Sequence, residues 1–404
     1  MISNCRSCNT SNLVSVVDLG EQYLSDFRPD YTTPPKFPLR LLLCMNCNLA
    51  QLDTTVDRDS MYHDGYGYRS GVNEIIVKNL KMLVNYANGF IPNPKRWLDI
   101  ACNDGTLLSL VEDSTFKVGV DPVSKFKVES SLHANLIVSD YFPSESTKNI
   151  GEFDVITSIS MFYDLDDPNE FVSEVKNHLS KNGIWVVQQN YLLSMLQNNS
   201  FDNICHEHIE YYSLRAMKHL IEQNGLEIVD IFLDDINGGS LITSIAHPGI
   251  FEVSSKVENQ LKIEMDFGLM DLTPYKNFEL GIQNIRESLV SILNAAKIEN
   301  KRVQIYGAST RGATIWQYLG LGPELIESAV ERQPEKIGKV FSAISIPIIG
   351  EEEMRLNPPD YLLVGPWFLR DSFVRREKKY LDSGGTFIFP LPKVELVKNS
   401  IKLV

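Results

Sequence analysis

Four cysteines near the N-terminus could bind a metal ion. Cys5 and Cys8 form one Cys-x2-Cys pair, and Cys44 and Cys47 form a second pair after 35 intervening residues. Two such pairs offer the four thiolates that tetrahedral zinc prefers, and in a chain expected to be cytoplasmic they favour a metal over disulfides. Because four sulfurs leave no coordination position open for water or substrate, we expect a structural zinc site.

A turn of small and polar residues could hold a cofactor that contains a nucleoside. It follows an apolar stretch at residues 97–100, and Gly105 would let its backbone approach a ligand closely. Asp121 ends the next apolar stretch, where its carboxylate could accept hydrogen bonds from both ribose hydroxyls. Ala101 and Asn103 stand where a dinucleotide fingerprint has glycines, which argues against NAD and favours S-adenosylmethionine (SAM), which has no phosphate.

The segment after the third predicted strand adds a carboxylate and two aromatic rings. Asp140 could supply a polar contact to adenine, and Tyr141 or Phe142 could present an aromatic face, although either ring could equally belong to the core. The predicted cofactor contacts are Asp99, Ala101, Asn103, Gly105, Asp121, Asp140, Tyr141 and Phe142.

The densest cluster of titratable groups is Cys205-His206-Glu207-His208. His208 and Glu207 are the candidates for proton transfer, because histidine titrates near neutral pH and a buried glutamate can be shifted toward that range. A zinc protease site fits poorly, since its two histidines stand four residues apart and these stand two apart. The cluster could also be a structural polar network.

Four further segments could contact a substrate. Tyr66 and Tyr68 lie at a predicted domain junction, where they could form a substrate wall or simply pack. Residues 237–240 could form a backbone cradle or an ordinary turn. Residues 307–312 follow a predicted strand and could grip a diphosphate, and Trp367 could stack on a base. The predicted substrate contacts are Tyr66, Asn237, Gly239, Ser240, Ser309, Thr310, Arg311 and Trp367.

The pattern of apolar residues predicts the elements that position these groups. An amphipathic helix begins near residue 72, and short strands alternate with helices between residues 97 and 188. This alternation predicts an α/β fold with an open parallel sheet. A second doubly wound unit is predicted after a long helical region, beginning with a strand at residues 302–306.

Composition restricts the class of protein. A length of 404 residues predicts two or three domains. The net charge of -14 argues against a nucleic-acid partner, because such binding relies on Lys and Arg that neutralise phosphates. The apolar runs are too short to span a membrane, and the N-terminus lacks the pattern of a secretory signal, so a cytoplasmic location is expected. The sequence allows either a monomer or a homodimer.

Taken together, the two Cys-x2-Cys pairs, the Asp-Ile-Ala-Cys-Asn-Asp-Gly turn, Cys-His-Glu-His, Asn-Gly-Gly-Ser and Gly-Ala-Ser-Thr-Arg-Gly resemble, in kind and order, the nucleotide-sugar C-methyltransferases. The resemblance implies a small zinc-binding domain at residues 1–71, a class I SAM methyltransferase domain with a Rossmann-like fold at 72–247, and a second Rossmann-like domain at 248–404. The chain departs from the family pattern at Cys205, where tyrosine is common, and at Gln188, where an acidic residue is common.

The resemblance also implies where each ligand lies. SAM would lie on the turn at residues 99–105 with its ribose on Asp121. A nucleotide-linked sugar would face residues 66–68 and 206–208, and its diphosphate would lie near residues 309–311. The C-terminal domain would thus bind the nucleotide.

The implied reaction is methylation at C3 of an NDP-4-keto-6-deoxy sugar, in which a base removes the C3 proton and the enolate carbon attacks the methyl group of SAM. His208 would be the base, Glu207 would orient it or share the proton, and Tyr68 would steady the enolate oxygen. Which of His208, Glu207, His206 and Tyr68 takes the proton stays open. The alternatives are O- or N-methylation of a nucleotide sugar, or a module that binds SAM or a nucleotide without catalysis.

Overall fold

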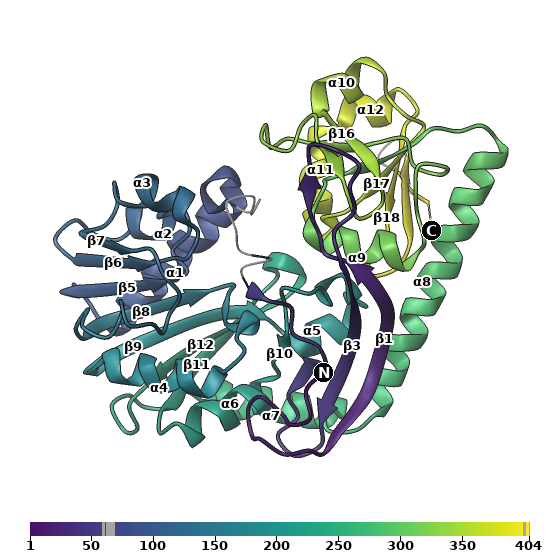
Figure 1. Cartoon of the computed structure of the whole chain (residues 1–404). Coiled ribbons are helices and arrows are strands. Elements are labelled where there is room, and N and C mark those ends of the chain that lie inside the picture. Colours follow the sequence, from purple (N-terminus) through teal and green to yellow (C-terminus); the bar gives the residue numbers. More distant parts are fainter. Residues whose placement is uncertain (59–60, 62–68, 399–400, 404) are drawn as a thin grey trace.

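A computed structural model of the chain describes residues 1–58, 61, 69–398 and 401–403. In Figure 1 a seven-stranded sheet forms one lobe and a nine-stranded sheet forms the other, and strands β1 and β3 and helix α8 extend side by side from one lobe to the other. None of the helices in this described part combines the length and the hydrophobicity that a transmembrane span requires.

The N-terminal segment forms a four-stranded sheet in the order β1-β3-β4-β10. Its strands are β1 (Leu13–Tyr23), β3 (Lys36–Cys44), β4 (Ala50–Leu52) and β10 (Glu210–Tyr211). The short strand β2 (Phe27–Arg28) leaves this sheet and pairs with β15 (Val340–Phe341) of the second lobe. Strands β2 and β10 therefore tie the N-terminal segment to both lobes.

The first lobe contains the seven-stranded sheet, in the order β11-β12-β9-β8-β5-β6-β7. Its strands are β5 (Arg96–Ile100), β6 (Phe116–Val120), β7 (Leu136–Val138), β8 (Phe153–Ile159), β9 (Leu179–Asn190), β11 (Glu227–Asp234) and β12 (Ser240–Ala246). The five strands from β7 to β9 are parallel, as predicted, whereas β12 and β11 are antiparallel additions.

The helices of this lobe alternate with its strands. They are α1 (Glu74–Phe90), α2 (Thr106–Ser109), α3 (Lys127–Ser130), α4 (Pro168–His178), α5 (Leu192–Gln197) and α6 (Leu214–Gln223). Side-chain caps start several of them: Asn73 caps α1, Asp167 caps α4 and Ser213 caps α6. Asp167 thus fixes the end of the turn after β8, whereas α2 and α3, which follow β5 and β6, begin without a side-chain cap.

The second lobe contains the nine-stranded sheet, in the order β2-β15-β16-β14-β13-β17-β18-β19-β20. Its other strands are β13 (Val303–Tyr306), β14 (Ala329–Glu331), β16 (Ile346–Gly350), β17 (Tyr361–Val364), β18 (Thr386–Phe389), β19 (Glu395–Lys398) and β20 (Ile401–Leu403). The five central strands from β16 to β18 are parallel. The predicted α/β class with a second doubly wound unit is confirmed.

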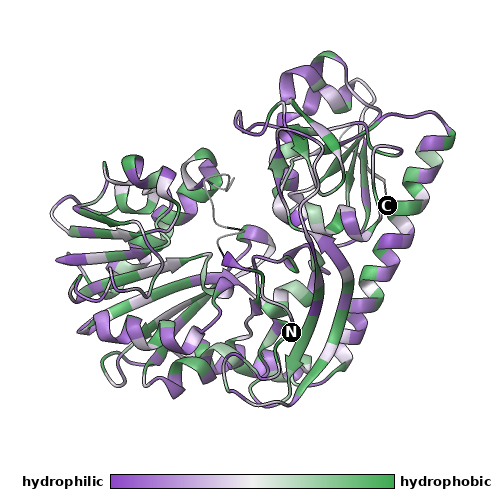
Figure 2. Ribbon diagram, in the orientation of Figure 1, coloured by the Kyte–Doolittle hydropathy of each residue, from purple (hydrophilic) through white to green (hydrophobic). Residues whose placement is uncertain are grey.

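Two helices lead into the second lobe and four belong to it. They are α7 (Ser255–Phe267) and α8 (Thr273–Ile298), then α9 (Thr310–Tyr318), α10 (Glu351–Leu356), α11 (Arg370–Arg376) and α12 (Lys378–Asp382). The buried residues of α8 recur every three to four positions from Tyr275 to Leu293, which is the spacing of one helix face. Figure 2 shows hydrophobic residues concentrated on the strands, whereas hydrophobic and hydrophilic residues alternate along α8.

One apolar cluster extends through both lobes, and a second, smaller cluster that contains Trp97 and Ile184 lies in the first lobe. The larger cluster of buried side chains includes Leu41 of β3, Phe171 of α4, Phe278 of α8 and Trp316 of α9. Because burial of apolar surface is the main favourable contribution to folding, this continuity holds the lobes in a defined relation. Side chains from both lobes can therefore contribute to one site.

Candidate functional site

Four cysteine side chains converge at the start of the chain with the geometry of a zinc site. Cys44 ends β3, Cys47 follows in the turn to β4, and Cys5 and Cys8 precede β1. Their sulfur atoms all lie within 4.8 Å of one another, with Cys5 Sγ 3.6 Å from Cys47 Sγ and Cys8 Sγ 3.5 Å from Cys44 Sγ. Sulfurs about 2.3 Å from a tetrahedral zinc ion lie about 3.8 Å apart, so these residues fit the ion and fill its coordination sphere.

The cysteine cluster supports a segment far along the chain. Gln51 of β4 donates its Nε2–H to Cys5 Sγ at 3.2 Å, a kind of contact that orients metal ligands. The backbone of Gln51 pairs with Glu210 of β10. Since β10 begins two residues after His208, the metal site and the titratable cluster belong to one continuous structure.

A pocket at the carboxyl ends of β5, β6 and β7 contains most of the predicted cofactor contacts. Cofactors bind at this edge in open α/β sheets. Seven of the eight predicted residues line the pocket: Asp99, Ala101, Asn103, Asp121, Asp140, Tyr141 and Phe142. Gly105 is not among the lining residues.

The turn after β5 has an unusual backbone. Ala101 and Asn103 adopt positive φ angles of 60° and 50°, a region that glycine enters most easily, so the backbone takes a glycine-like path without glycines. Gly105 also has a positive φ, and a Cβ at this position would lie 2.8 Å from Ser130 Cα. The glycine is therefore needed for packing against α3, a different reason from the ligand approach that the sequence suggested.

Buried carboxylates make the pocket acidic. Asp121 accepts the backbone N–H of Asn103 at 2.8 Å and that of Val123 at 2.9 Å, one on each oxygen, which leaves each oxygen a further lone pair for a ribose hydroxyl. Asp99 accepts the Thr157 hydroxyl at 2.7 Å, and burial raises the pKa of Asp99 to about 7. Buried carboxylates favour a cation and disfavour a phosphate, so the pocket suits SAM, with its sulfonium and ammonium groups.

The two predicted adenine-facing rings lie in different surroundings. Phe142 is 6% exposed and packs edge-on against Phe171, with ring centroids 5.3 Å apart, so much of its surface belongs to the core. Tyr141 is half-buried, and the Arg58 guanidinium lies over its ring at 5.5 Å. Asp140 accepts the backbone N–H of Tyr141 at 2.8 Å. Tyr141 is thus the more accessible of the two aromatic faces.

Sequence reasoning missed several residues that line this pocket, including Asn79, Asp164 and Arg58. Asn79 exchanges hydrogen bonds with Gln188, at 2.8 Å from Asn79 Nδ2 to Gln188 Oε1 and 3.2 Å in the reverse direction. Asn79 is a polar residue on the buried apolar face of α1, and such a break in an amphipathic pattern is the signal that could have found it. Gln188 also lines the pocket, and its departure from the family pattern was the sequence feature that drew attention to it.

His208 is half-buried, and its hydrogen bond indicates a neutral imidazole. Its Nδ1 lies 3.1 Å from the Asn203 carbonyl oxygen, and because a carbonyl only accepts, Nδ1 carries the proton and Nε2 keeps its lone pair. Its ring lies against that of Tyr163, with centroids 4.3 Å apart. Burial, aided by the positive charge of Arg311, lowers the pKa of His208 to about 3.

Glu207 is half-buried, as His208 is, whereas His206 is buried. Burial raises the pKa of Glu207. His206 is 4% exposed, and its Nε2–H donates to the carbonyl oxygen of Phe37 in β3 at 3.1 Å, so its ring joins the segment to the N-terminal sheet. Tyr66 and Tyr68 lie outside the described residues. Among the predicted proton-transfer groups, the structure thus separates His206 from His208 and Glu207 by its contacts.

Arg311 and Trp367 connect the second lobe to the first. The Arg311 guanidinium contacts Asp202 Oδ2 through Nε at 2.9 Å and Nη2 at 2.6 Å, and its Nη1 donates to the Asn237 carbonyl oxygen at 2.6 Å. Trp367 donates its Nε1–H to the same Asp202 oxygen at 3.1 Å and packs against Gly238. Both side chains therefore have partners inside the protein, where the sequence suggested a diphosphate and a base.

The Asn-Gly-Gly-Ser segment lies between this contact and the cofactor pocket. Asn237 lines the pocket and has a positive φ of 56°. Gly239 has a φ of 121°, and a Cβ there would lie 2.4 Å from that of Ser194, so only glycine fits. Ser240 is buried, and its hydroxyl donates to the Ile236 carbonyl oxygen at 3.1 Å. Of the predicted substrate contacts that the structure describes, Asn237 is the one that lines this pocket.

The predicted diphosphate turn begins α9. Ser309 is the N-cap, and its hydroxyl oxygen accepts the backbone N–H of Gly312 at 3.1 Å, with Thr310 the first residue of the helix. Lys336 reaches this turn and donates from Nζ to the Ala308 carbonyl oxygen at 2.8 Å. A cation thus stands beside the start of α9, and sequence reasoning did not identify it.

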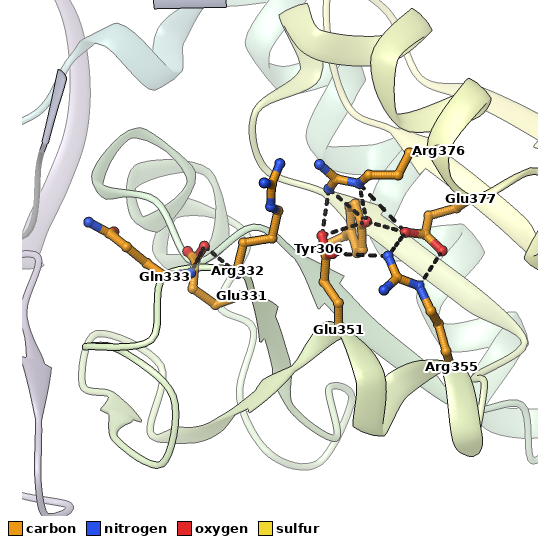
Figure 3. A network of polar contacts seen from close by, with 8 residues as sticks. All are labelled: Tyr306, Glu331, Arg332, Gln333, Glu351, Arg355, Arg376 and Glu377. Atoms are coloured by element: carbon orange, nitrogen blue, oxygen red, sulfur yellow. Dashed lines mark hydrogen bonds and ion pairs between the residues drawn. The ribbon is translucent and has the colours of Figure 1, made fainter. Parts of the chain in front are cut away.

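A polar network lies at the end of β13 in the same lobe (Figure 3). The Tyr306 hydroxyl contacts Glu351 at 3.0 Å, Glu377 at 2.8 Å and Arg376 at 2.8 Å. Arg355 contacts both carboxylates, which leaves two guanidinium groups balanced by two carboxylates. The charges are balanced within the protein, so we infer that this network stabilises the fold and does not bind a ligand.

Glu331 ends β14, the strand that follows α9. Its Oε1 accepts the backbone N–H groups of Arg332 at 2.7 Å and Gln333 at 3.2 Å (Figure 3). Asp121 likewise accepts the N–H of a residue two positions further along the chain. Lys336 Nζ lies 3.7 Å from Glu331 Oε2. The second doubly wound unit therefore presents a carboxylate where such units bind a ribose.

Three family models match successive parts of the chain. They describe a zinc binding domain at residues 5–62, a methyltransferase domain at residues 69–231 and a C-methyltransferase C-terminal domain at residues 235–392. Together they follow the order of the cysteine cluster, the acidic pocket and the second lobe.

The chain is also similar to individual proteins. It is 27% identical over 408 residues to the C-methyltransferase NovU of Streptomyces niveus, covering 98% of this chain and 97% of that protein. It is 25% identical over 145 residues to a tRNA U34 carboxymethyltransferase of Campylobacter jejuni, covering 33% of this chain and 50% of that protein. A solved SAM-dependent methyltransferase of Clostridium acetobutylicum aligns at 14% identity and a TM-score of 0.35, covering 44% of this chain and 93% of that one.

Proposed function

Because this chain is a SAM-dependent methyltransferase with a zinc-binding N-terminal unit and a C-methyltransferase C-terminal unit, we propose that it methylates carbon C3 of an NDP-4-keto-6-deoxy sugar. One observation carries the proposal. The rings of Tyr163 and His208 lie 4.3 Å apart, and Asp164, the residue after Tyr163, lines the pocket that suits SAM. His208 itself is not among the residues that line that pocket, so the acceptor would have to reach from the pocket to the imidazole; a carbon acceptor needs such a base because its C–H must first lose a proton.

The cofactor contacts follow from the acidic pocket. Asp121 would accept the ribose hydroxyls, Asp140 and Tyr141 would contact adenine, and Asp99 would face the cationic part of the molecule. Bound SAM supplies an electrophilic methyl group to the acceptor atom. The protein's contribution at this point is to hold the acceptor carbon in line with that group.

His208 would remove the proton. A keto group at C4 acidifies the hydrogen at C3, and the lone pair on His208 Nε2 accepts it, while Asn203 keeps the proton on Nδ1. Glu207, whose pKa burial raises, would share or orient that proton. The contact of His206 with Phe37 favours a structural role for His206. Tyr68, which lies outside the described residues, would steady the enolate oxygen, as the resemblance implies.

The nucleotide would bind the second lobe at the ends of β13 and β14. Glu331 would accept the hydroxyls of the nucleoside ribose, as Asp121 would for SAM. Lys336 and the start of α9 at Ser309 and Thr310 would face the diphosphate, because a helix N-terminus and an ammonium group both favour negative charge. Arg311 forms an ion pair with Asp202, so it would hold the two lobes together and would not bind the diphosphate directly.

Mass spectrometry of reactions with SAM tests this function. The zinc-loaded protein is incubated with TDP-, GDP-, CDP- and UDP-linked 4-keto-6-deoxy sugars, each also without enzyme. A gain of one CH2 on a single sugar supports the proposal and identifies the nucleotide. No gain on any sugar, in a protein that binds SAM, would contradict it and favour another acceptor or a module that binds without catalysis.

A further inference from the structure

A fully buried carboxylate joins the two lobes close to His208 in the chain. Asp202 is 0% exposed and lies in the short 3-10 helix η5 (Phe201–Asn203) of the first lobe. Its Oδ2 receives both Arg311 and Trp367 from the second lobe, at distances between 2.6 and 3.1 Å. Charge-assisted hydrogen bonds of this kind are stronger than neutral ones and fix direction as well as distance. The position of η5 is thus set by contacts from the other lobe.

The residue after Asp202 holds the imidazole. The Asn203 carbonyl oxygen accepts His208 Nδ1–H at 3.1 Å, while the Tyr211 hydroxyl lies 2.7 Å from the His208 carbonyl oxygen and 3.2 Å from that of Asn203. The Asn203 side chain is fixed as well, since its Oδ1 accepts Asn190 Nδ2–H at 2.9 Å. A rotation of η5 would therefore move the acceptor that determines which His208 nitrogen carries the proton.

We propose that Asp202 is a positioning residue for the base: by binding Arg311 and Trp367 it anchors η5, and η5 presents the Asn203 carbonyl that orients His208 and keeps Nε2 unprotonated. The inference takes from the proposed function only the role of His208 as base. Through Arg311 and Trp367, the second lobe would thus help to position the base, in addition to any binding of substrate.

The electrostatics of the same contact support the assignment. The Asp202 carboxylate is the counter-ion of Arg311, whose positive charge acts on the imidazole of His208. A buried guanidinium without its carboxylate would be costly and would favour a new arrangement of the segment. Loss of Asp202 would therefore disturb both the direction of the Asn203 carbonyl and the charge beside His208.

Nitrogen-15 NMR of the histidine side chains tests the proposal without any acceptor sugar. The sample is the full-length, zinc-loaded protein labelled with 15N-histidine and saturated with S-adenosylhomocysteine, and a His208→Gln spectrum assigns the resonance. The wild-type protein should show His208 as the Nδ1–H tautomer. Asp202→Asn should lower the ratio of Nδ1–H to Nε2–H by about tenfold, the effect expected from one lost hydrogen bond.

A matched control removes a carboxylate from an arginine elsewhere in the second lobe. Glu327 pairs with Arg302 at 2.9 Å on the surface, so Glu327→Gln makes the same chemical change away from η5 and should leave the His208 tautomer unchanged. If Asp202→Asn loses zinc or S-adenosylhomocysteine binding, the double variant Asp202→Asn/Arg311→Met removes both charges, and the same tenfold change is expected.

The proposal would be overturned by a His208 tautomer ratio that stays within about twofold of the wild-type ratio in a folded Asp202 variant. Loss of the fold in both variants would also overturn it, because Asp202 would then serve general stability. Since no acceptor takes part, failure of the nucleotide-sugar proposal would leave this result intact. With an identified acceptor, Asp202→Asn should lower kcat while the KM for SAM stays near the wild-type value.

Discussion

The ring of Tyr163 lies against the ring of His208, with centroids 4.3 Å apart and planes inclined by 59°. Tyr163 belongs to a short 3-10 helix, Phe162–Asp164. The last residue of this helix, Asp164, lines the acidic pocket. His208 thus packs against the residue that precedes Asp164 in the chain and does not itself line the pocket. If His208 is the proposed base, this contact connects proton removal to the segment that lines the proposed SAM pocket.

Replacement of the base should abolish catalysis and spare binding. His208→Gln should lower kcat by about 100- to 10,000-fold, the usual contribution of a positioned general base, with the Kd for SAM unchanged. Steady-state kinetics and calorimetry measure the two quantities. The comparison variant is His206→Gln, whose ring contacts Phe37 and which should lose stability more than rate. Equal losses of kcat in both variants would contradict the assignment of His208.

The pH profile should lack the usual histidine step. A base acts in its unprotonated form, which prevails above its pKa, and burial keeps the pKa of His208 at about 3 instead of 6.5. As pH falls from 7.5 to 5.5, His208 therefore stays neutral, so kcat at saturating SAM should stay level, whereas protonation of Asp99, whose pKa is about 7, should raise the KM for SAM. Stopped assays with the zinc-loaded protein measure the profile. A fall of kcat centred near pH 6.5 would contradict the lowered pKa of His208.

Loss of zinc should disturb the segment that contains His208. Cys47→Ser should abolish zinc binding and lower the Tm by roughly 10 °C, because structural zinc contributes directly to folding. Activity should fall too, since β4 near the metal pairs with β10 next to His208. Elemental analysis and thermal melts provide the measurements. Cys102→Ser, a change in the cofactor pocket, should retain zinc. Full activity in a zinc-free protein would refute this link.

The ribose carboxylate should govern cofactor affinity. Asp121→Asn should raise the Kd for SAM at least about tenfold, because a carboxylate that accepts ribose hydroxyls is worth more than an amide. Isothermal titration measures this change. Glu112→Gln, at an exposed position of the same lobe, is the matched control and should leave the Kd unchanged. An unaltered Kd in Asp121→Asn would place the ribose elsewhere.

The ammonium group beside α9 should affect the acceptor more than the cofactor. Lys336→Met should raise the KM for the nucleotide sugar about tenfold or more, while the KM for SAM stays constant, because the loss concerns a charge-assisted contact to a diphosphate. Lys301→Met, an exposed lysine of the same lobe, should change neither constant. A raised KM for SAM alone would remove Lys336 from the proposed nucleotide site.

The fold was largely predictable because its signals are local. The strand pattern between residues 97 and 188 and the strands at 303–306, 361–364 and 386–389 follow from apolar runs bounded by turns. The pairing of β10 with β4 and of β2 with β15 was not predictable. Strands of two residues carry no periodicity, and their partners are chosen by tertiary packing.

The parts of the candidate site that could be predicted are those in which one residue type at a fixed spacing is enough to identify a ligand site. The four cysteines and the Asp99–Asp121 pattern are of this kind. The roles of Arg311 and Trp367 could not be predicted, because the sequence cannot show that Asp202, 109 residues before Arg311, lies opposite it. Likewise, the distinction between His206 and His208 depends on which backbone carbonyl each ring meets, and no local pattern encodes that.

The central claim, methylation of carbon, is tested most directly by the attachment of the transferred methyl group. The zinc-loaded protein is supplied with SAM labelled with 13C in its methyl group and with the sugar that gains mass, and the product is examined by 13C NMR. The account predicts a single methyl resonance bonded to carbon, coupled to C3 of the sugar. A methyl resonance bonded to oxygen or nitrogen would contradict it.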